Sequence, residues 1–516
     1  MARQRYLVLL GAVIVQLLLG TIYGYSIFWQ PLQAEVFPAV VLEGSPAHEA
    51  ALAAEQQVVV APDGAEMSRL QAQRRGYLTY AFSIALLSFA GVMVLAGRVQ
   101  DIKGPRLTAS IGGVLMAGGF VVAGLMNHAL TFYLAHAAFT GVVTLVALML
   151  FHALTRHGDR SDNPLLKYAP LAIVATCVTA GGVMGTQYLG RLGPFDDLFL
   201  LWGTIGFLAG AGVGFAYVCP IAALVKWFPK QKGLVAGLAV AGFGFGAYVF
   251  SHPTLPFSAA TFLENHGVVA LFLAHGGVLL VGVVGGAMLL SNPPAPATSA
   301  TAGGAGAPSN DSSWQETLRR PAFWTLWVMF FSGSVAGLMV IGILAPFAGE
   351  QLVSAAAAVR ELEGEEVASL LARGAAAVGW LAIFNALGRI FWGLVSDRIG
   401  RTPSFVVLFL LQAVTMVSLG LMQTELTLGI VAALVGFNYG GLFPLFPAAT
   451  ADLFGSRNMG ANYGWLFTSY GIAGVVGTAL GHMAHVHTGS YMPAFVVAAL
   501  LCVLAAGLAV ALHARS

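Results

Sequence analysis

Long apolar stretches separated by short polar loops run along almost the whole chain. A helix needs roughly 20 apolar residues to cross about 30 Å of hydrocarbon. By this criterion we predict fourteen transmembrane helices, at residues 6–29, 76–97, 107–127, 131–153, 167–189, 198–222, 233–252, 267–290, 321–347, 374–395, 403–421, 426–448, 460–482 and 491–512. The first run is too long for a signal peptide and lacks a small-residue cleavage pattern, so we expect it in the mature chain. The predicted fold class is an all-α polytopic membrane protein.

Composition supports a membrane setting. Hydrophobic residues make up 58% of the 516 residues and charged residues only 9%, whereas soluble proteins carry about 25% charged residues. The net charge of +2 gives no reason to expect a nucleic-acid partner. The three cysteines lie far apart in apolar runs and are interpreted as packing residues. We expect no metal site and no cofactor.

The distribution of lysine and arginine predicts the orientation. If the N-terminus is cytoplasmic, seventeen of the 24 basic residues fall in loops on that side, six fall on the other side, and one lies inside a span. Such a bias is typical of the cytoplasmic face. We therefore expect both termini in the cytoplasm and the protein in a bacterial inner membrane.

Two segments repeat along the chain. "GRVQDIKGPR" at 97–106 and "GLVSDRIGR" at 393–401 share G-x-x-x-D-x-x-G followed by a basic residue. A second pair, "GFAYVCP" at 214–220 and "GFNYGGLFP" at 436–444, shares Gly-Phe-x-Tyr at a shorter separation. The difference in separation matches the two spans at 131–153 and 167–189. We infer two six-helix halves, with a hairpin of two helices inserted in the first.

The domain organisation follows from these repeats. Residues 1–290 form the predicted N-terminal bundle, with the inserted hairpin at about 128–197. Residues 291–318 are rich in Pro, Gly, Ala and Ser and form a flexible cytoplasmic linker. Residues 319–516 form the C-terminal bundle.

The duplicated loop resembles the signature loop of the major facilitator superfamily, whose two six-helix bundles surround a central cavity. Segments 20–33, 210–250 and 462–477 further resemble the oxalate/formate antiporter family, relatives of the monocarboxylate porters. The resemblance implies alternating access and a small carboxylate substrate. It also implies a gating role for the two loops, whose residues are Gly97, Asp101, Gly104, Arg106, Gly393, Asp397, Arg398, Gly400 and Arg401.

Arg389 is the basic residue inside a predicted span. An arginine at a helix centre costs roughly 2.5–3.5 kcal/mol on insertion scales, so it normally faces a partner or a substrate path. The equivalent position in the first half is Met93, so the fold itself does not require a cation there. Snorkelling to the nearby charged loop is the alternative. The family places its substrate-binding arginine on this helix, and Arg389 is interpreted as the carboxylate anchor.

Two other positions bear on the substrate. Family members that handle oxalate carry a lysine where this chain has Tyr470. A single cation favours a monocarboxylate such as formate, lactate or pyruvate over a dicarboxylate. Asn385 stands where eukaryotic monocarboxylate porters carry an aspartate. The alternatives left open are an oxalate-type antiporter and a transporter of neutral solutes or drugs.

Aromatic residues complete the predicted site. Tyr23, Tyr25, Tyr217, Tyr439 and Trp465 lie in the family-like stretches and are predicted to line the substrate site with Tyr470. Plain packing is an equal alternative for each of them.

The coupling mechanism is left open by the sequence. The predicted spans hold no Asp or Glu, and His136, His275 and His482 are better interpreted as packing or interfacial residues than as proton carriers. Anion exchange with a counter-anion and proton-coupled symport both remain. The spans lack the clustered His, Asp, Glu or Cys of an enzyme and the charged rings of a channel.

Overall fold

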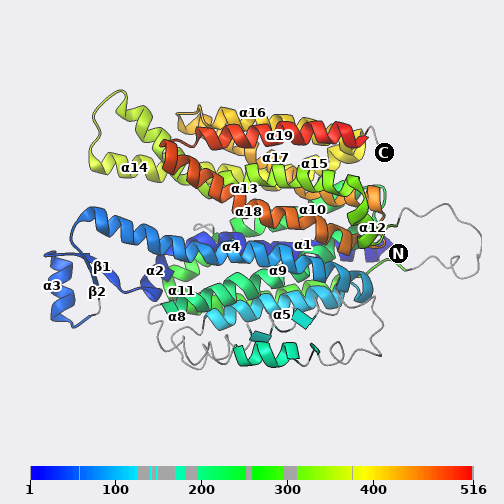
Figure 1. Ribbon diagram of the computed structural model, residues 1–516, viewed down its shortest axis with the longest axis horizontal. Helices are drawn as coiled ribbons and strands as arrows, with labels where there is room; N and C mark the ends of the chain where they lie inside the picture. The colour runs from blue at the N-terminus through cyan, green and yellow to red at the C-terminus, as the bar shows by residue number, and fades with distance from the viewer. Residues whose placement is uncertain are drawn as a thin grey trace, which may run out of the picture.

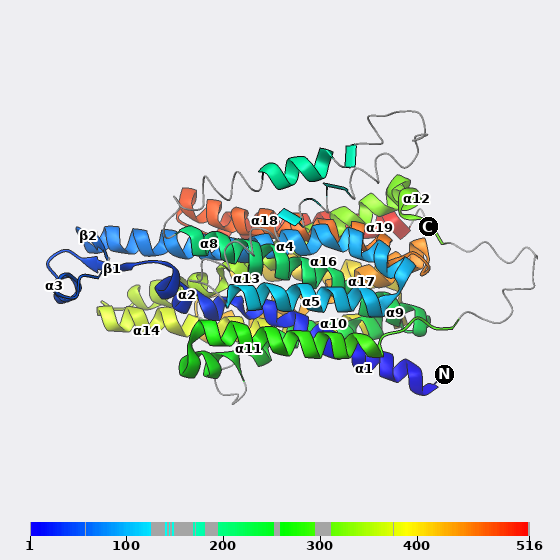
Figure 2. The same cartoon turned by 90° about the horizontal axis from the view of Figure 1, so that it is seen from below.

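The computed structural model describes a helical protein whose long helices lie side by side (Figure 1). The described residues are 2–56, 58–124, 140–141, 144, 147–148, 169–170, 172–180, 195–251, 258–294, 311–374 and 376–513. Both chain ends lie at the same end of the helices, which we call the terminal end (Figures 1 and 2). The opposite end, which carries residues 39–61, is called the far end.

The first half begins with an α-helix that continues directly into a 3₁₀ helix. Its elements are α1 (Ala2–Leu19), the 3₁₀ helix η1 (Gly20–Phe28), α2 (Trp29–Val36), β1 (Ala39–Leu42), α3 (Pro46–Ala53), β2 (Val58–Ala61), α4 (Gly64–Lys103), α5 (Pro105–Ala123), α8 (Phe195–Leu201), the π-helix η3 (Trp202–Ala209), α9 (Gly210–Trp227), α10 (Lys232–Ser251) and α11 (Ala259–Leu289). The strands β1 and β2 pair in parallel, with Ala39 opposite Val58.

The second half follows the linker. Its elements are α12 (Trp314–Arg319), α13 (Pro321–Ala357), α14 (Gly364–Gly374), α15 (Ala376–Ile399), α16 (Arg401–Leu419), α17 (Glu425–Phe454), α18 (Met459–Thr488) and α19 (Met492–His513). Ser313 and Glu316 form a reciprocal capping box at the start of α12. The Ser313 backbone N–H, hydrogen-bonded to the Glu316 carboxylate, lowers the pKa of that carboxyl.

The all-α membrane fold is confirmed, with adjustments. Within the described residues, eleven helical segments are long and apolar enough to cross a membrane. The predicted span at 460–482 is a helix, α18, packed between α4 and α13. It is not one of the eleven segments, because its glycines and polar residues lower its mean hydropathy. Helix α4 begins at Gly64, earlier than the predicted 76. Most of the predicted hairpin region lies outside the described residues, and so does most of the linker.

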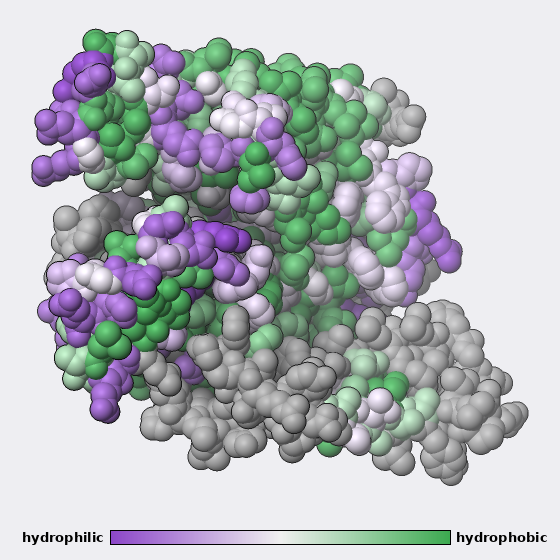
Figure 3. All heavy atoms as spheres, turned by 60° about the vertical axis from the view of Figure 1, so that its left-hand side comes forward, coloured by the Kyte–Doolittle hydropathy of each residue, from purple (hydrophilic) through white to green (hydrophobic). Residues whose placement is uncertain are grey.

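The surface is zoned as a bilayer requires. Between the two ends, apolar side chains predominate on the face seen in Figure 3, and hydrophilic residues gather at the ends. Many of the exposed side chains are leucine and valine, among them Leu426, Leu500 and Val281. Such a surface is stable when lipid tails, rather than water, surround it.

Two helix pairs join the halves, and they are related by the sequence repeat. Helix α4 packs against α18, and α15 packs against α10. A Cβ atom added at Gly97 would lie 2.0 Å from the Gly460 carbonyl oxygen, and one at Gly393 would lie 2.3 Å from that of Gly233. Glycine at these positions therefore allows the two backbones to touch.

Candidate functional site

Arg389 is buried between the two halves. Its side chain is 2% exposed, although it belongs to a helix whose neighbouring residues face lipid. The Nε atom donates to Asn385 Oδ1 at 2.8 Å, and Nη1 donates to the Val240 carbonyl oxygen of α10 at 2.6 Å. The guanidinium carbon lies 4.3 Å from the Phe443 ring centre and 5.9 Å from that of Phe243. Arg389 therefore points inward, which excludes snorkelling in this conformation.

The positive charge of Arg389 has no ionic partner in the described part of the chain. No carboxylate there lies within 4.0 Å of the guanidinium, and Nη2 has no acceptor among those residues. Of the lysines and arginines described, Arg389 is the one that is buried. Aromatic faces and neutral oxygens stabilise a cation only in part. The group is therefore suited to bind an anion.

Close helix packing sets the direction of this side chain. A Cβ atom added at Gly388 would lie 2.0 Å from the Phe437 carbonyl oxygen, so α15 and α17 are in backbone contact. Asn385 lies one turn before Arg389 on the same face, which brings its amide oxygen to Nε. On α10, an added Cβ at Gly244 would lie 3.4 Å from Arg389 Nε. A larger residue there would crowd the guanidinium.

Three of the predicted tyrosines form one cluster across the halves. The Tyr23 hydroxyl from η1 is hydrogen-bonded to the Tyr470 hydroxyl from α18. Tyr439 of α17 donates to the same Tyr470 oxygen at 3.4 Å. We call these residues the tyrosine trio. Tyr23 and Tyr439 also interact electrostatically with Arg389, so the structure brings these predicted residues together, and their role in substrate binding stays a prediction.

The other predicted aromatic residues are placed differently. Tyr217 is 1% exposed and packs on Phe243 and Phe467, with ring centres 5.2 and 5.4 Å apart. Trp465 stacks on Trp314 of the linker helix α12, with ring centres 5.7 Å apart, and its place in the substrate site stays a prediction. The side chain of Tyr25 lies outside the described residues.

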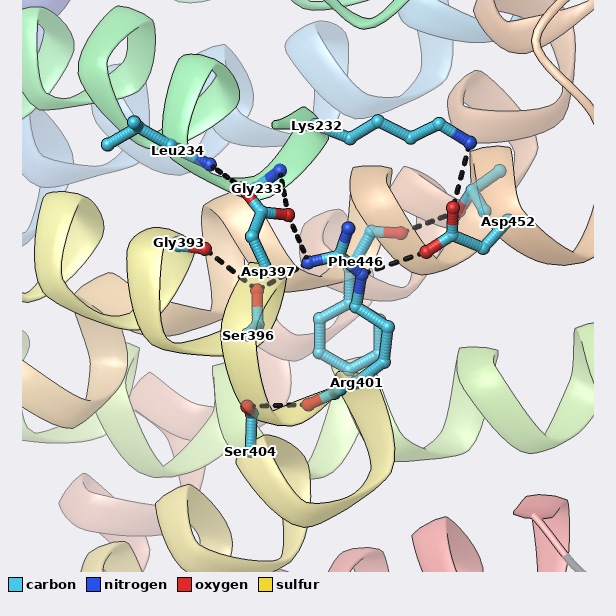
Figure 4. Close-up of polar contacts among 12 residues, drawn as sticks. Lys232, Gly233, Leu234, Gly393, Ser396, Asp397, Arg401, Ser404, Phe446 and Asp452 are labelled. Carbon is cyan, nitrogen blue, oxygen red and sulfur yellow. Dashed lines mark hydrogen bonds and ion pairs between the residues drawn. The ribbon is translucent and has the colours of Figure 1, made fainter. Parts of the chain in front are cut away.

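The signature loop of the second half holds the terminal end of the two halves together. Asp397 accepts hydrogen bonds from the backbone N–H groups of Gly233 (2.9 Å) and Leu234 (2.8 Å) at the start of α10. Arg401 binds both Asp397 and Asp452 at 2.8 Å (Figure 4). A carboxylate at a helix N-terminus satisfies free N–H groups and complements the helix dipole. These contacts are called the Asp397 latch.

Lys232 strengthens this latch across the halves. Its Nζ lies 2.8 Å from Asp452 Oδ1, so a residue of α10 is paired with one of α17 (Figure 4). Ser396 also accepts a hydrogen bond from Arg401 at 2.6 Å. Arg398, predicted with this loop, is exposed.

The signature loop of the first half repeats the arrangement. Asp101 accepts from the N–H groups of Gly460 (3.1 Å) and Ala461 (2.8 Å) at the start of α18, and Lys226 lies 3.7 Å away. Arg106 reaches another target, the Leu290 carbonyl oxygen at 2.7 Å. We call these contacts the Asp101 latch.

The backbone conformation explains the glycine that stands three residues after each of these aspartates. Gly104 has φ +89° and Gly400 has φ +93°. Residues with a side chain rarely adopt a positive φ, whereas glycine adopts it freely. The repeated D-x-x-G spacing therefore encodes a turn that brings each carboxylate to the other half.

Sequence reasoning missed several residues around Arg389. Val240 acts through its backbone oxygen, for which the sequence holds no signal. Phe243 and Phe443 flank the cation, and Tyr463 packs on Phe467 with ring centres 5.7 Å apart. Tyr463 lies in the family-like stretch 462–477, seven residues before Tyr470, so helical periodicity could have found it.

No group of three or more His, Cys, Asp or Glu able to hold a metal ion is found among the described residues. Two halves joined by two repeated helix pairs, with an inward-facing cation between them, are typical of transporters that work by moving one half against the other. The Major Facilitator Superfamily model matches residues 166–360 and 359–516. The chain belongs to this superfamily and is one of its transporters.

The chain is also similar in sequence to individual transporters. The chain is 31% identical over 343 residues to the oxalate:formate antiporter of Oxalobacter formigenes, covering 64% of this chain and 73% of that one. It is 30% identical over 281 residues to the uncharacterized transporter YhjX of Escherichia coli, covering 54% and 64%. It is 27% identical over 344 residues to apicoplast pyruvate carrier 1 of Toxoplasma gondii, covering 57% and 61%. The matched part thus spans about two thirds of the length of these relatives.

Solved structures agree on the fold. The proton:xylose symporter XylE superposes with a TM-score of 0.57 at 14% identity, covering 98% of this chain and 95% of that one. At this identity the likeness concerns the architecture alone.

Proposed function

We infer that this protein moves a small monocarboxylate across the membrane by alternating access. The observation that carries the proposal is Arg389: a buried cation between the halves, without a carboxylate partner in the described part of the chain. A guanidinium matches a carboxylate with two parallel N–H donors. The similarity to the oxalate:formate antiporter and to a pyruvate carrier supports the same substrate class.

The positions of the halves suggest which conformation is present. Contacts between α4 and α18 run from Gly97 and Gly460 at the terminal end to Leu86 and Gly474. Farther along α18, Gly477 instead contacts α13 of its own half. At the far end, Figure 3 shows a hollow between an upper and a lower lobe. In the proposed cycle this is the state that is closed at the terminal end.

Orientation follows from charge. We place the terminal end, with both chain ends, in the cytoplasm of a bacterium because the basic loops gather there. The protein would then sit in the inner membrane with its far end outside. The two latches, at residues 97–106 and 393–401, are the proposed cytoplasmic gate.

Coupling has two candidate forms. In anion exchange, the charge of Arg389 is neutralised by one anion or another before the halves reorient. In symport, a proton accompanies the substrate through the same site. Exchange predicts uptake that depends on an anion on the opposite side, whereas symport predicts uptake that responds to a pH gradient.

The test uses the purified protein in proteoliposomes, with radiolabelled formate, lactate, pyruvate and oxalate in counterflow, with and without a pH gradient. We expect Arg389→Gln to lower monocarboxylate transport at least 100-fold, because a neutral amide removes the anchoring charge. Arg389→Lys should retain part of it, since the charge stays but the two-pronged geometry is lost. Transport by both variants at the parental rate would show that Arg389 is not the anchor.

Oxalate:formate antiport is the second candidate, and the 31% identity to the Oxalobacter formigenes protein favours it. One buried cation among the described residues leaves one charge of a dicarboxylate unpaired. We therefore expect oxalate to compete more weakly than formate or pyruvate. Tighter competition by oxalate would favour the antiporter.

A further inference from the structure

Two phenol hydroxyls near Arg389 lack hydrogen-bond partners in the part of the chain that the structure describes. Tyr217 of α9 and Tyr463 of α18 are both fully buried, and neither hydroxyl has a partner among the described residues. Buried polar groups in native proteins are nearly always paired, and an unpaired one is destabilising. Phenylalanine would fill either position without that cost. The two hydroxyls therefore point to a function.

The pair forms a unit that crosses the halves. Both rings pack on Phe467, with ring centres 5.4 Å away for Tyr217 and 5.7 Å for Tyr463. The two phenols interact electrostatically with each other and with Arg389. Tyr217 is next to Phe243, the ring over which the Arg389 guanidinium lies. We call Tyr217 and Tyr463 the unpaired phenols.

The unpaired phenols differ from the tyrosine trio in an important way. The hydroxyls of Tyr23, Tyr439 and Tyr470 already bind one another. The guanidinium of Arg389 can engage both oxygens of a carboxylate by itself. Donors that remain unused after these contacts would match an additional acceptor oxygen on the same ligand.

We propose that the Tyr463 and Tyr217 hydroxyls donate hydrogen bonds to an oxygen on the carbon next to the substrate carboxylate. The protein would thereby select 2-oxo- and 2-hydroxy-monocarboxylates over simple fatty acids. This inference rests on the proposed function, because the carboxylate must first be held by Arg389. Tyr463 belongs to α18 and Tyr217 to α9, so the ligand oxygen would be bound by both halves. A ligand without it leaves two buried donors unpaired.

The size of the selection follows from that penalty. A site built to hydrogen-bond a polar group rejects the analogue that lacks it, because its own donors are left unsatisfied. For one to two neutral donors we expect roughly 10- to 100-fold. Pyruvate and propionate have closely similar shapes and share the same charge, so their comparison isolates the 2-oxygen.

The experiment measures uptake of radiolabelled pyruvate in proteoliposomes and its inhibition by unlabelled pyruvate, lactate and propionate. For the parent protein, half-inhibition by propionate should need at least 10-fold more ligand than half-inhibition by pyruvate or lactate. In Tyr463→Phe this ratio should fall to about threefold or less, with propionate itself binding as before. Tyr491→Phe, a matched removal of a phenol oxygen near the far end, should keep the parental ratio.

A thermal unfolding measurement separates selection from folding. Because the Tyr463 hydroxyl has no partner in the described residues, Tyr463→Phe should melt at or above the parental temperature. A lower melting temperature together with equal losses for pyruvate and propionate would overturn the inference, since it would show a structural role. So would a parent protein that binds propionate as tightly as pyruvate, or one that carries formate but not pyruvate.

The Arg389→Gln variant keeps the two proposals apart. If it loses transport while Tyr463→Phe keeps the parental pyruvate-to-propionate ratio, the anchor stands and the role of the unpaired phenols is wrong. If Arg389→Gln transports like the parent, the proposed function itself fails.

Discussion

The Asp397 latch offers the sharpest test of how the halves move. We consider the substitution Asp397→Asn, which keeps the shape of the side chain and removes its charge. In the structure the carboxylate accepts two backbone N–H groups at 2.9 and 2.8 Å, from Gly233 and Leu234, and pairs with Arg401 at 2.8 Å. The amide oxygen of asparagine can keep one neutral hydrogen bond and loses the other contacts.

The magnitude follows from these contacts. Hydrogen bonds to a charged group contribute about 1.5–3 kcal/mol, and neutral ones about 1 kcal/mol. Replacing two charge-assisted bonds by one neutral bond removes roughly 2 kcal/mol or more from the state that is closed at the terminal end. A state in which the halves part at the terminal end would not make the bonds to Gly233 and Leu234, so nothing would offset the loss. The closed-to-open ratio should therefore fall about 30-fold.

The assay is a distance measurement between spin labels on cysteines placed at Lys230 and Ile399. Both positions are exposed and lie on opposite halves at the terminal end. The native Cys177, Cys219 and Cys502 are replaced first. We expect Asp397→Asn to add a population at longer distance.

The control is Glu425→Gln, which removes a carboxylate from an exposed ion pair with Arg373 at the start of α17. Such pairs contribute little, so the distance distribution should match that of the parent. The reasoning is refuted if Asp397→Asn also gives the parental distribution, because the carboxylate would then not hold the terminal end closed.

Two further predictions concern glycines. Gly393→Val should reduce transport at least 10-fold, because the valine side chain would meet the Gly233 carbonyl oxygen and keep the terminal end from closing. Gly379→Val, on the same helix, faces open space and should transport normally. Equal transport rates in the two variants would contradict the importance of the backbone contact. Gly400→Ala should lower the melting temperature by at least about one degree, because alanine is strained at φ +93° by more than about 1 kcal/mol and the unfolding entropy of a chain of this length is large. Unchanged melting beside Gly285→Ala, a helical position with open space, would contradict this.

Much of the fold could be read from local patterns. The apolar periods predicted the helices because a helix in lipid must satisfy its backbone internally, whatever it packs against. The repeat G-x-x-x-D-x-x-G predicted equivalent loops, and its glycines do adopt the positive φ that the turn needs. Boundaries were less accurate: α4 begins at Gly64 because Asp63 caps it there, well before the apolar run starts.

The substrate-binding role of the candidate residues stays a prediction, but their choice had physical reasons. Arg389 stood out because a cation in an apolar span is costly, and Asn385 was named because it stands where related porters carry an aspartate. The partner of Asp397 could not be predicted, because backbone N–H groups of α10 are present in every helix start and only packing selects one. The contact of Trp465 with Trp314 could not be predicted for a similar reason: periodicity tells which residues share a face, but not which helix covers that face.

The sequence by itself determined that this chain spans a membrane, that it is built from two related halves, and that one costly cation lies within a span. Each of these depends on transfer free energies and spacings that act along the chain. Only the tertiary structure decided that Arg389 meets Val240 and Phe443 and that three tyrosines bind one another. It also decided that the Tyr217 and Tyr463 hydroxyls find no partner among the described residues. These facts depend on which surfaces the halves bring together, and contacts between residues hundreds of positions apart leave no local trace.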